Sequence, residues 1–117
     1  EQLPREKVTF AVRGSATIND ATREDADQAG ISELVRVIDT GADIPGIVLS
    51  ESSSEFNDAF SSADVIIAKG QGNYETLSDA PKRVFFLFKV KCPVVAADSG
   101  EKHGDIVIHA HYPCGLL

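Results

Sequence analysis

Two glycine-containing segments hold the residues whose types and spacing could do chemistry. In the first, Lys69-Gly70-Gln71-Gly72-Asn73, a lysine precedes two glycines directly after an apolar run. Glycines let a backbone pass close to a ligand, and a helix that begins here would direct its first amide protons toward an anion. The lysine adds a full positive charge. This combination is typical of a phosphate-binding loop, and a tight strand-to-helix turn with a solvated lysine is the alternative.

Two familiar phosphate motifs do not describe this segment. It is not a Walker A loop, because its lysine precedes the glycines and the spacing differs. It is not a dinucleotide fingerprint either, because Glu75 stands where the third glycine would be. The expectation of a phosphate ligand therefore depends on charge and glycine content alone.

The second segment runs from Arg13 to Asp20 and ends in Asn19-Asp20. A carboxylate and an amide carbonyl are hard oxygen ligands of the kind that Mg²⁺ or Mn²⁺ prefers. Spacing alone favours a different role, because Asn and Asp are common helix N-caps and Thr22 with Asp25 has capping-box-like spacing. The residues by themselves leave both roles open.

The histidines and cysteines offer weaker candidates. His109 and His111 would share one face of a strand and could bind a metal, but solvated side chains are the simpler interpretation, and His103 falls in a loop. Cys92 precedes a proline and reads most simply as a small buried hydrophobe. Together with Cys114 it is too few for a disulfide framework, so we expect reduced thiols and a cytoplasmic protein.

Charge and hydropathy exclude several partners. The net charge of −7 and the pI near 4.8 argue against nucleic acid, whose recognition needs a positive surface. The same balance argues against an anionic membrane surface and is compatible with a bound divalent cation. No apolar run approaches the roughly 20 residues that span a bilayer. We therefore expect no nucleic acid and no membrane partner, and the sequence leaves the oligomeric state open.

Strands that alternate with helices must position the two segments. β-branched and apolar runs predict strands at 8–12, 34–38, 64–68, 84–90 and 105–109, and a short one at 47–49. A helix is expected over about 21–28, stopped by Gly30. A capping box from Ser52 to Glu55 predicts a second helix that buries Phe56 and Phe60. A third runs from the Lys69–Asn73 turn through about Ser78.

This pattern predicts an α/β fold: a three-layer, mostly parallel sheet flanked by helices, Rossmann-like in style. The run at 64–68 would be a central parallel strand covered on both faces. Ligands of such sheets bind at the carboxyl ends of strands, where both segments lie. We expect residues 1–117 to form a single domain. Because the chain has no methionine and Glu1–Lys7 reads as a helix end, we also expect a C-terminal piece of a longer two-domain protein, incomplete at its N-terminus.

The same residues closely resemble the damage-control phosphatase family, long catalogued as a domain of unknown function. The likeness runs from about Val8 to Ile108. It is carried by Arg13-Gly14, Ile18-Asn19-Asp20-Ala21-Thr22, Glu24-Asp25-Ala26, the stretch 64–77 and the stretch 91–96. The resemblance implies a metal-dependent phosphatase that acts on small phosphorylated metabolites, such as sugar phosphates or phosphopantetheine-type compounds.

The resemblance also implies roles for particular residues. Asp20 would be a metal ligand, with Asn19 a weaker candidate beside it, and the cation would be Mn²⁺, Co²⁺, Ni²⁺ or Mg²⁺. The loop Lys69–Asn73 would contact the substrate near its phosphate, with Lys69 taking a catalytic role and Arg13 assisting. Family members carry an Asp-Asn-x-Gly-Glu motif upstream that this chain lacks. We therefore expect the 117-residue chain alone to bind metal weakly and to be a poor catalyst.

Two other classes of function remain open from the sequence. The first is an S-adenosylmethionine-dependent carboxyl methyltransferase, which needs no metal, although a lysine-led glycine loop suits phosphate better than a sulfonium. The second is a non-catalytic protein that binds phosphometabolites. Binding and hydrolysis would use the same loops, so the sequence does not rank this binding protein against a phosphatase.

Overall fold

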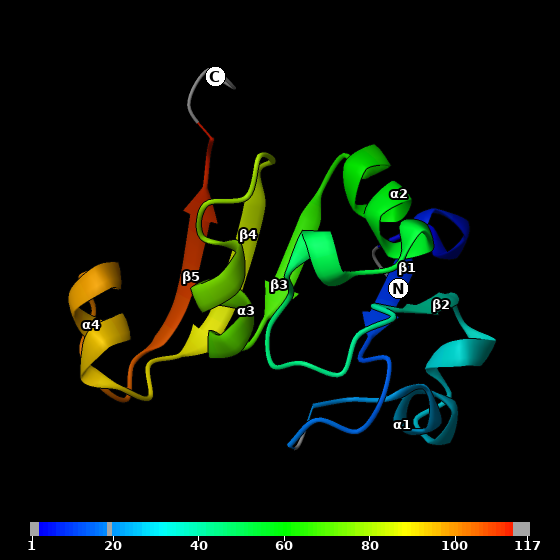
Figure 1. Cartoon of the computed structure of the whole chain (residues 1–117), viewed down its shortest axis with the longest axis horizontal. Helices are drawn as coiled ribbons and strands as arrows, with labels where there is room; N and C mark the ends of the chain where they lie inside the picture. Colours follow the sequence, from blue (N-terminus) through cyan, green and yellow to red (C-terminus); the bar gives the residue numbers. More distant parts are fainter. Residues whose placement is uncertain (1–2, 19, 114–117) are drawn as a thin grey trace. The chain divides into compact units, whose positions relative to one another are not determined.

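The computed structural model describes residues 3–18 and 20–113. The chain divides into two compact units. Their helices and strands are labelled in Figure 1. The N-terminal unit comprises residues 1–45 and 49–62, and the C-terminal unit comprises residues 46–48 and 63–117. Each unit has its own small sheet. The α/β class predicted from the sequence is confirmed, whereas a single three-layer Rossmann-like sheet is not.

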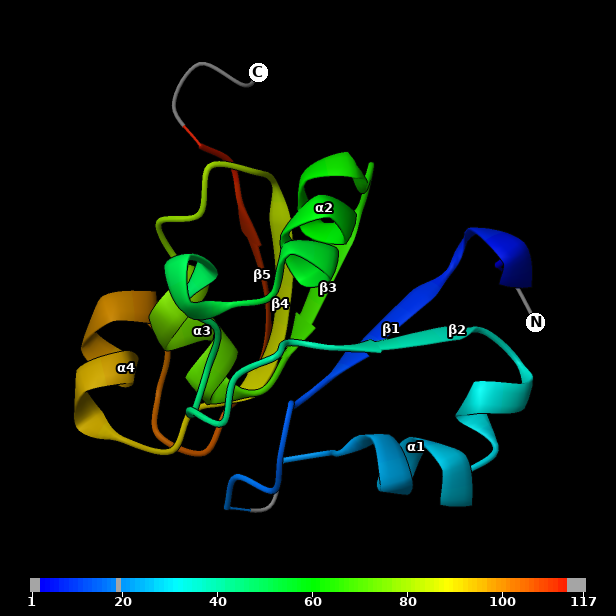
Figure 2. The same cartoon turned by 45° about the vertical axis from the view of Figure 1, so that its right-hand side comes forward.

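The N-terminal unit is built on two parallel strands, β1 (Thr9–Val12) and β2 (Arg36–Asp39), shown side by side in Figure 2. Thr9 pairs with Arg36 and Val12 with Asp39. The connection contains helix α1 (Arg23–Gln28), and helix α2 (Ser54–Ser62) follows β2. Single 3₁₀ turns complete the unit: η1 (Arg5–Lys7), η2 (Ile31–Glu33) and η3 (Leu49–Glu51). Parallel pairing brings the ends of β1 and β2 to the same edge.

Helix α1 begins with the predicted capping box. The Thr22 backbone N–H donates to Asp25 Oδ2 at 2.8 Å, and the Asp25 N–H donates to Thr22 Oγ1 at 3.4 Å. Hydrogen bonds from Thr22, the backbone one first, lower the pKa of the Asp25 carboxyl. Gly30 follows the helix with φ of 76°, the left-handed conformation expected of it. This helix is confirmed, with its start two residues later than expected.

The N-cap of helix α2 lies one residue later than predicted. Ser53, not Ser52, is the capping residue, because its Oγ accepts the Phe56 N–H at 3.1 Å. The Ser53 N–H also donates to the Thr40 carbonyl at 2.8 Å, which holds this serine beside the end of β2. Phe56 and Phe60 are buried as predicted, with ring centroids 6.0 Å apart. The expected strand at 47–49 is wrong, since no described strand includes these residues.

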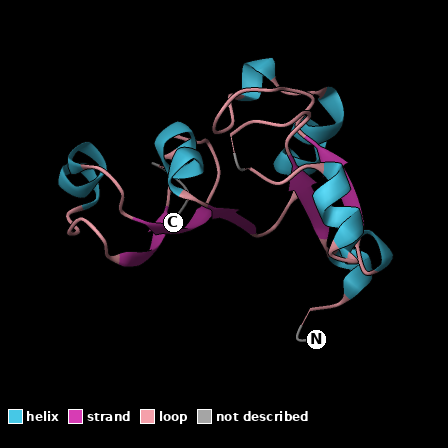
Figure 3. Cartoon of the chain, turned by 90° about the horizontal axis from the view of Figure 1, so that it is seen from below, coloured by secondary structure: helices cyan, strands magenta, loops and turns pink. Residues whose placement is uncertain are grey.

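The C-terminal unit has a three-stranded sheet in the order β3 (Ile66–Lys69), β4 (Val84–Lys89), β5 (Ile106–His111). Helices α3 (Gln71–Leu77) and α4 (Pro93–Ser99) lie on one face of it (Figure 3). On that face Tyr74 and Leu77 of α3 are buried, as are alternate residues of β4. The Tyr74 ring stacks on Phe88 with centroids 4.5 Å apart. This aromatic layer is the core of the unit.

The sheet differs from the prediction in two ways. Strand β3 is parallel to β4 but lies at the edge, so the expectation of a central strand at 64–68 is wrong. Its apolar residues alternate in burial, Ala68 being 6% exposed and Ile67 61%. Strand β5 is antiparallel to β4. The chain returns after α4 directly beside Val90, whose N–H donates to the Asp105 carbonyl at 2.9 Å, so the next strand runs back along β4.

Helix α4 has no counterpart among the predicted elements. Pro93 stands at its start, where proline has no hydrogen bond to lose, and Cys92 is the N-cap. Within the described ranges, no helix combines the length and apolar content needed to cross a membrane.

Candidate functional site

The loop after β1 folds back on itself and pairs its first and last charged residues. The Arg13 N–H donates to the Ala21 carbonyl and the Asp20 N–H to the Thr17 carbonyl, both at 2.9 Å. Arg13 Nε donates to Asp20 Oδ2, also at 2.9 Å. The arginine is 8% exposed, whereas the Asp20 side chain is 40% exposed. The loop therefore holds a carboxylate at the surface with a buried guanidinium behind it.

Helix capping does not explain Asp20. The capping role belongs to Thr22, whose side chain accepts the Asp25 N–H. Asp20 instead faces Arg13, seven residues earlier. Its proposed role as a metal ligand stays a prediction, and Asn19 lies outside the described residues.

A strained residue precedes this acidic position. Ile18 has φ of 53°, and its side chain is 89% exposed. A left-handed conformation is rare for a β-branched residue and costs about 1–2 kcal/mol. The backbone hydrogen bonds at Arg13 and Asp20 close the loop around it.

A crevice of about 300 Å³ opens at the carboxyl ends of β1 and β2. It is lined by Gly14, Ser15, Asp39, Gly41, Ala42 and Asp43. Gly14 is required by space, because a Cβ there would lie 2.8 Å from the Ala42 nitrogen. Asp39 is engaged at both carboxylate oxygens, one by the Gly41 N–H at 2.9 Å and the other by Arg23 Nη2 at 3.2 Å.

No role in a site was predicted from the sequence for residues 39–43, which follow the predicted strand at 34–38. The signal that could have found them is position: Asp39 ends β2 and Thr40-Gly41 follows it, as Val12 ends β1 and Arg13-Gly14 follows it. Because the two strands are parallel, both loops lie at the same edge.

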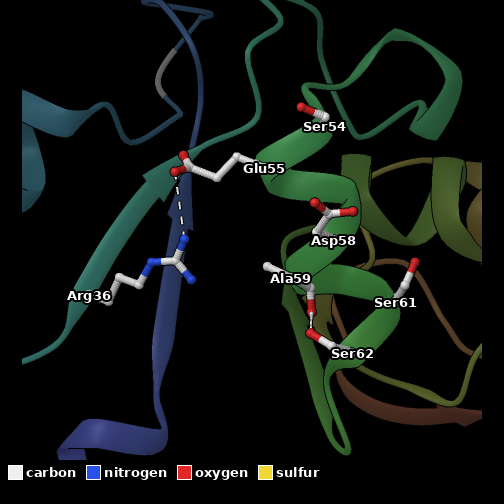
Figure 4. Close-up of a pocket in the computed structure, with 7 residues that line it drawn as sticks. All are labelled: Arg36, Ser54, Glu55, Asp58, Ala59, Ser61 and Ser62. Atoms are coloured by element: carbon white, nitrogen blue, oxygen red, sulfur yellow. Dashed lines mark hydrogen bonds and ion pairs between the residues drawn. The ribbon is translucent and has the colours of Figure 1, made fainter.

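A larger groove, of about 800 Å³, lies between β2 and α2 (Figure 4). Its one basic residue, Arg36, pairs with Glu55 at 3.6 Å, and Asp58 also lines it. A phosphate here would face two carboxylates for one arginine that is already paired. The smaller crevice is the better match by position only, because it lies at the carboxyl ends of β1 and β2 while Asp39 and Asp43 line it without a basic residue.

The loop after β3 carries its lysine in the open. Lys69 is the last residue of β3 and is exposed. Asn73 Nδ2 donates to the Lys69 carbonyl at 2.7 Å, which ties the first turn of α3 to the strand end. Gly70 has φ of 101°, and a Cβ on it would meet no atom within 4 Å. Backbone conformation, not crowding, thus requires this glycine, and a ligand would have space beside it.

The amides and side chains of this loop are not all available to a ligand. The Gly70 N–H donates to the Leu87 carbonyl at 2.8 Å, so it belongs to the sheet. Gln71 Oε1 accepts the Lys91 N–H at 2.6 Å, and its Nε2 donates to Cys92 Sγ at 3.8 Å. Gly72 meets only ordinary contact, because a Cβ there would lie 3.6 Å from the Gly46 nitrogen. Among the predicted contacts of this loop, Lys69 is exposed, whereas residues 70–73 are half-buried.

Cys92 does more than fill space. It is half-buried, and its Sγ accepts the Val95 N–H at 3.5 Å, so it caps α4. The interpretation as a buried hydrophobe is therefore incomplete. Cys114 lies outside the described residues.

The described residues do not assemble a complete metal site. No group of three or more His, Cys, Asp or Glu side chains comes together within 3–18 and 20–113. His103 Nε2 contacts the Lys91 carbonyl at 3.2 Å, and His111 Nε2 contacts the Ala80 carbonyl at 2.9 Å. The His109 ring packs edge-on against Tyr74 at 5.6 Å. The structure thus gives no support to a histidine metal site, and within the part of the chain that it describes Asp20 belongs to no group of three such ligands.

The predicted site residues fall into two groups. Arg13 and Asp20 are brought together in the N-terminal unit, while Lys69, Gln71 and Asn73 belong to the C-terminal unit. Each group lies at the carboxyl end of a parallel strand of its own unit.

These features define a class: an α/β protein whose strand ends carry a cationic glycine loop and an acidic loop. Residues 1–107 match the family model described as the damage-control phosphatase ARMT1-like domain. The chain therefore belongs to this family.

Related proteins extend well beyond the matched region. A damage-control phosphatase of Pyrococcus horikoshii is 48% identical over 107 residues, which cover 91% of this chain and 37% of that protein. A damage-control phosphatase of Archaeoglobus fulgidus is 42% identical over 104 residues, 87% of this chain and 36% of its own. The crystal structure of a DUF89 family protein from P. horikoshii superposes with a TM-score of 0.85 at 47% identity, covering 89% of this chain and 37% of that one. The chain thus spans little more than a third of the length of these relatives.

Proposed function

We propose that the protein is a metal-dependent phosphatase that hydrolyses small phosphorylated metabolites. The observation that carries the proposal is the family match over residues 1–107, which includes both candidate loops. Two relatives in this family are named damage-control phosphatases. The exposed lysine at the end of β3 is the chemical support, because it offers a full positive charge beside an open glycine.

We propose Asp20 as one ligand of a divalent cation, Mn²⁺, Co²⁺, Ni²⁺ or Mg²⁺, with Asn19 a weaker candidate. A carboxylate is the ligand type such cations prefer, and Asp20 is the most exposed member of its ion pair. Since the described residues hold no group of three ligands, the remaining ligands would come from outside them. When bound, the cation would supply charge neutralisation at the phosphoryl group.

The protein's own residues would bind and orient the substrate. The Lys69 ammonium would attract the phosphate and stabilise the charge that grows on its oxygens in the transition state. The Gly72 amide lies in the first turn of α3, where N–H groups have no acceptor within the helix. Asn73 fixes the Lys69 carbonyl, so it would hold the loop in shape as well as orient the substrate.

Arg13 is better suited to hold Asp20 than to contact substrate. Its guanidinium is buried and donates through Nε to Asp20 Oδ2. A fixed carboxylate loses less side-chain entropy when it binds a cation. Direct assistance by Arg13 at the phosphate is the less favoured form of this proposal.

The test is phosphate release from a panel of small phosphoesters, with Mg²⁺, Mn²⁺, Co²⁺ and Ni²⁺ added in turn to the full-length protein. We expect metal-dependent release that Asp20→Ala abolishes. We also expect Lys69→Ala to lower turnover more than tenfold, since one positioned charge is worth about that much or more.

The control is Lys7→Ala, which removes an exposed lysine from the 3₁₀ turn η1. An unchanged rate in Lys69→Ala would remove that residue from the site. If folded protein releases no phosphate with any metal, a phosphate-binding protein without catalysis or a methyltransferase would replace the proposal. Binding of inorganic phosphate or of S-adenosylmethionine would separate those two.

A further inference from the structure

The three-stranded sheet of the C-terminal unit has an apolar face that neither of the unit's helices covers. Helices α3 and α4 lie on the other face (Figure 3), where Tyr74 packs on Phe86, Phe88 and His109. Successive side chains of a strand point to opposite faces of the sheet. The residues that alternate with the packed ones form a surface that we call the uncovered face: Val65, Ile67, Phe85, Leu87, Ile106 and Ile108.

Strand register makes the uncovered face continuous. Ile67 of β3 pairs with Phe85 of β4, and Leu87 of β4 pairs with Ile108 of β5, so apolar side chains run across all three strands. Ile106 is 86% exposed, Ile108 76% and Ile67 61%. Single exposed apolar residues are normal on a protein surface, whereas a contiguous patch with a polar rim marks an interaction site.

Basic side chains stand at both ends of the uncovered face. Lys69 and Lys89 are the last residues of β3 and β4, and both are exposed. At the opposite end of β4, the Arg83 guanidinium carbon lies over the rings of Phe85 and Tyr112, 5.8 and 5.9 Å from their centroids. The three strands contain no Asp or Glu. The rim of this face is therefore positive, although the net charge of the chain is −7.

We propose that the uncovered face docks an amphipathic helix of a partner protein, with Asp or Glu on both sides of the helix's apolar stripe. Helices are the elements that cover the faces of α/β sheets, and an apolar stripe fits a flat apolar face. The acidic residues would meet Arg83 at one end and the two lysines at the other. The six residues of β4 extend about 20 Å, which roughly 13 residues of helix would span. This inference does not depend on the proposed phosphatase activity.

Charge favours this partner over two other occupants. In a face-to-face pair of two copies, the strands of the two sheets would lie within about 30° of one another. Because both ends of the face are basic, either direction of packing would set basic side chains against basic side chains, which is repulsive. The net charge of −7 likewise opposes an anionic membrane surface.

Peptide binding to the 117-residue chain tests the proposal. The probe is a labelled synthetic helix of about 18 residues, five turns long, with a leucine stripe flanked by glutamates. The comparison peptide carries lysines in place of the glutamates, and fluorescence anisotropy measures the binding of each. We expect saturable binding of the glutamate peptide and about tenfold weaker binding of the lysine peptide, because like charges then face each other. Arg83→Glu combined with Lys89→Glu should invert this preference.

A second variant removes the apolar contact. Ile106→Thr combined with Ile108→Thr keeps two residues that favour strands and should weaken binding of the glutamate peptide at least about tenfold, as loss of two buried isoleucine side chains would. Val94→Thr is the matched control, because Val94 is 75% exposed but lies on helix α4. It should bind as the parent chain does. Urea unfolding establishes that each variant is folded.

Equal affinity for the two peptides, binding of neither, or unchanged affinity in the double threonine variant would each overturn the proposal. Sedimentation of the chain alone, and with phosphatidylserine vesicles, covers the other occupants. A dimer that the double threonine variant loses would overturn the proposal in favour of a second copy. Vesicle binding that the same variant loses would overturn it in favour of a membrane surface.

Discussion

Asp20 and Thr22 lie two residues apart, and their side chains have different tasks. Thr22 caps helix α1 through a reciprocal pair of hydrogen bonds with Asp25. Asp20 takes no part in that cap and instead pairs with the buried Arg13. Separate tasks allow stability and activity to be tested independently at neighbouring positions.

Thr22→Ala should lower the free energy of unfolding by about 1 kcal/mol, the usual cost of losing an N-cap, without lowering metal-dependent activity. Asp20→Asn should lower metal-dependent activity and leave the free energy of unfolding nearly unchanged. An amide oxygen can still accept from Arg13 Nε, whereas the negative charge is lost. Urea unfolding and phosphate release on both variants measure the contrast. Equal losses of activity in the two would contradict the separation.

Because of Tyr74, the stability of the C-terminal unit should depend on pH in the alkaline range. Its hydroxyl donates to Asp98 Oδ2 at 2.7 Å, and the side chain is buried. Burial, together with the nearby carboxylate, raises the pKa of Tyr74 to about 12. In the unfolded chain the Tyr74 hydroxyl loses its proton near the ordinary pKa of 10. The stability that the protonated hydroxyl contributes to the folded unit is therefore complete below pH 10 and is lost as the pH rises toward 12.

The difference in unfolding free energy between the parent chain and Tyr74→Phe should therefore shrink from pH 9 to pH 11.5. Below pH 10 we expect Tyr74→Phe to cost about 1 kcal/mol, the net value of one hydrogen bond. Urea unfolding at several pH values measures it, with Tyr112→Phe as the control for an exposed tyrosine. A constant difference across this range would show that Tyr74 is not shifted.

At the scale of elements, the first turn of α3 contains a glycine that packing does not require. A Cβ at Gly72 would make only ordinary contact with Gly46, and glycine inside a helix is unfavourable by about 0.5–1 kcal/mol relative to alanine. A stabilising substitution is thus available at this position. Close approach of the backbone to a ligand is the reason we propose for the glycine.

Gly72→Ala should raise the free energy of unfolding by up to about 1 kcal/mol and lower phosphatase activity. Thermal unfolding and initial rates measured on one preparation give both quantities. Gly14→Ala is the contrasting variant, because the Ala42 backbone leaves no space for a Cβ there, and it should lose stability. Full activity in a stabilised Gly72→Ala would place the ligand elsewhere.

At the scale of the whole molecule, the metal ligands are the incomplete part. The described residues form no group of three ligands, and the chain spans little more than a third of the length of its relatives. We therefore expect the 117-residue chain to bind Mn²⁺ weakly, with a dissociation constant far above that of its longer relatives, and to be a poor catalyst. Calorimetric titration of the chain and of the Pyrococcus horikoshii relative with Mn²⁺ tests this expectation, and tight binding by the 117-residue chain would contradict it.

Local features were predictable because their hydrogen bonds join residues close in sequence. The Thr22–Asp25 box, the left-handed Gly30 and the buried pair Phe56 and Phe60 all depend on separations of a few residues. Even there, the α2 cap moved by one residue, because Ser53 is held by Thr40 from the preceding strand. The predicted strands that formed follow one another along the chain as expected, and their boundaries differ from the prediction by one or two residues.

The sequence by itself determined the α/β class, the two candidate loops and, through its motifs, the family. The tertiary structure decided how the strands divide into two sheets, that β5 runs antiparallel, and that α4 exists. It also decided that Asp20 faces Arg13 and that Gln71 contacts Lys91, 20 residues away. The physical reason is range: caps and turns are fixed by neighbouring residues, whereas partners distant in sequence depend on the path of the whole chain.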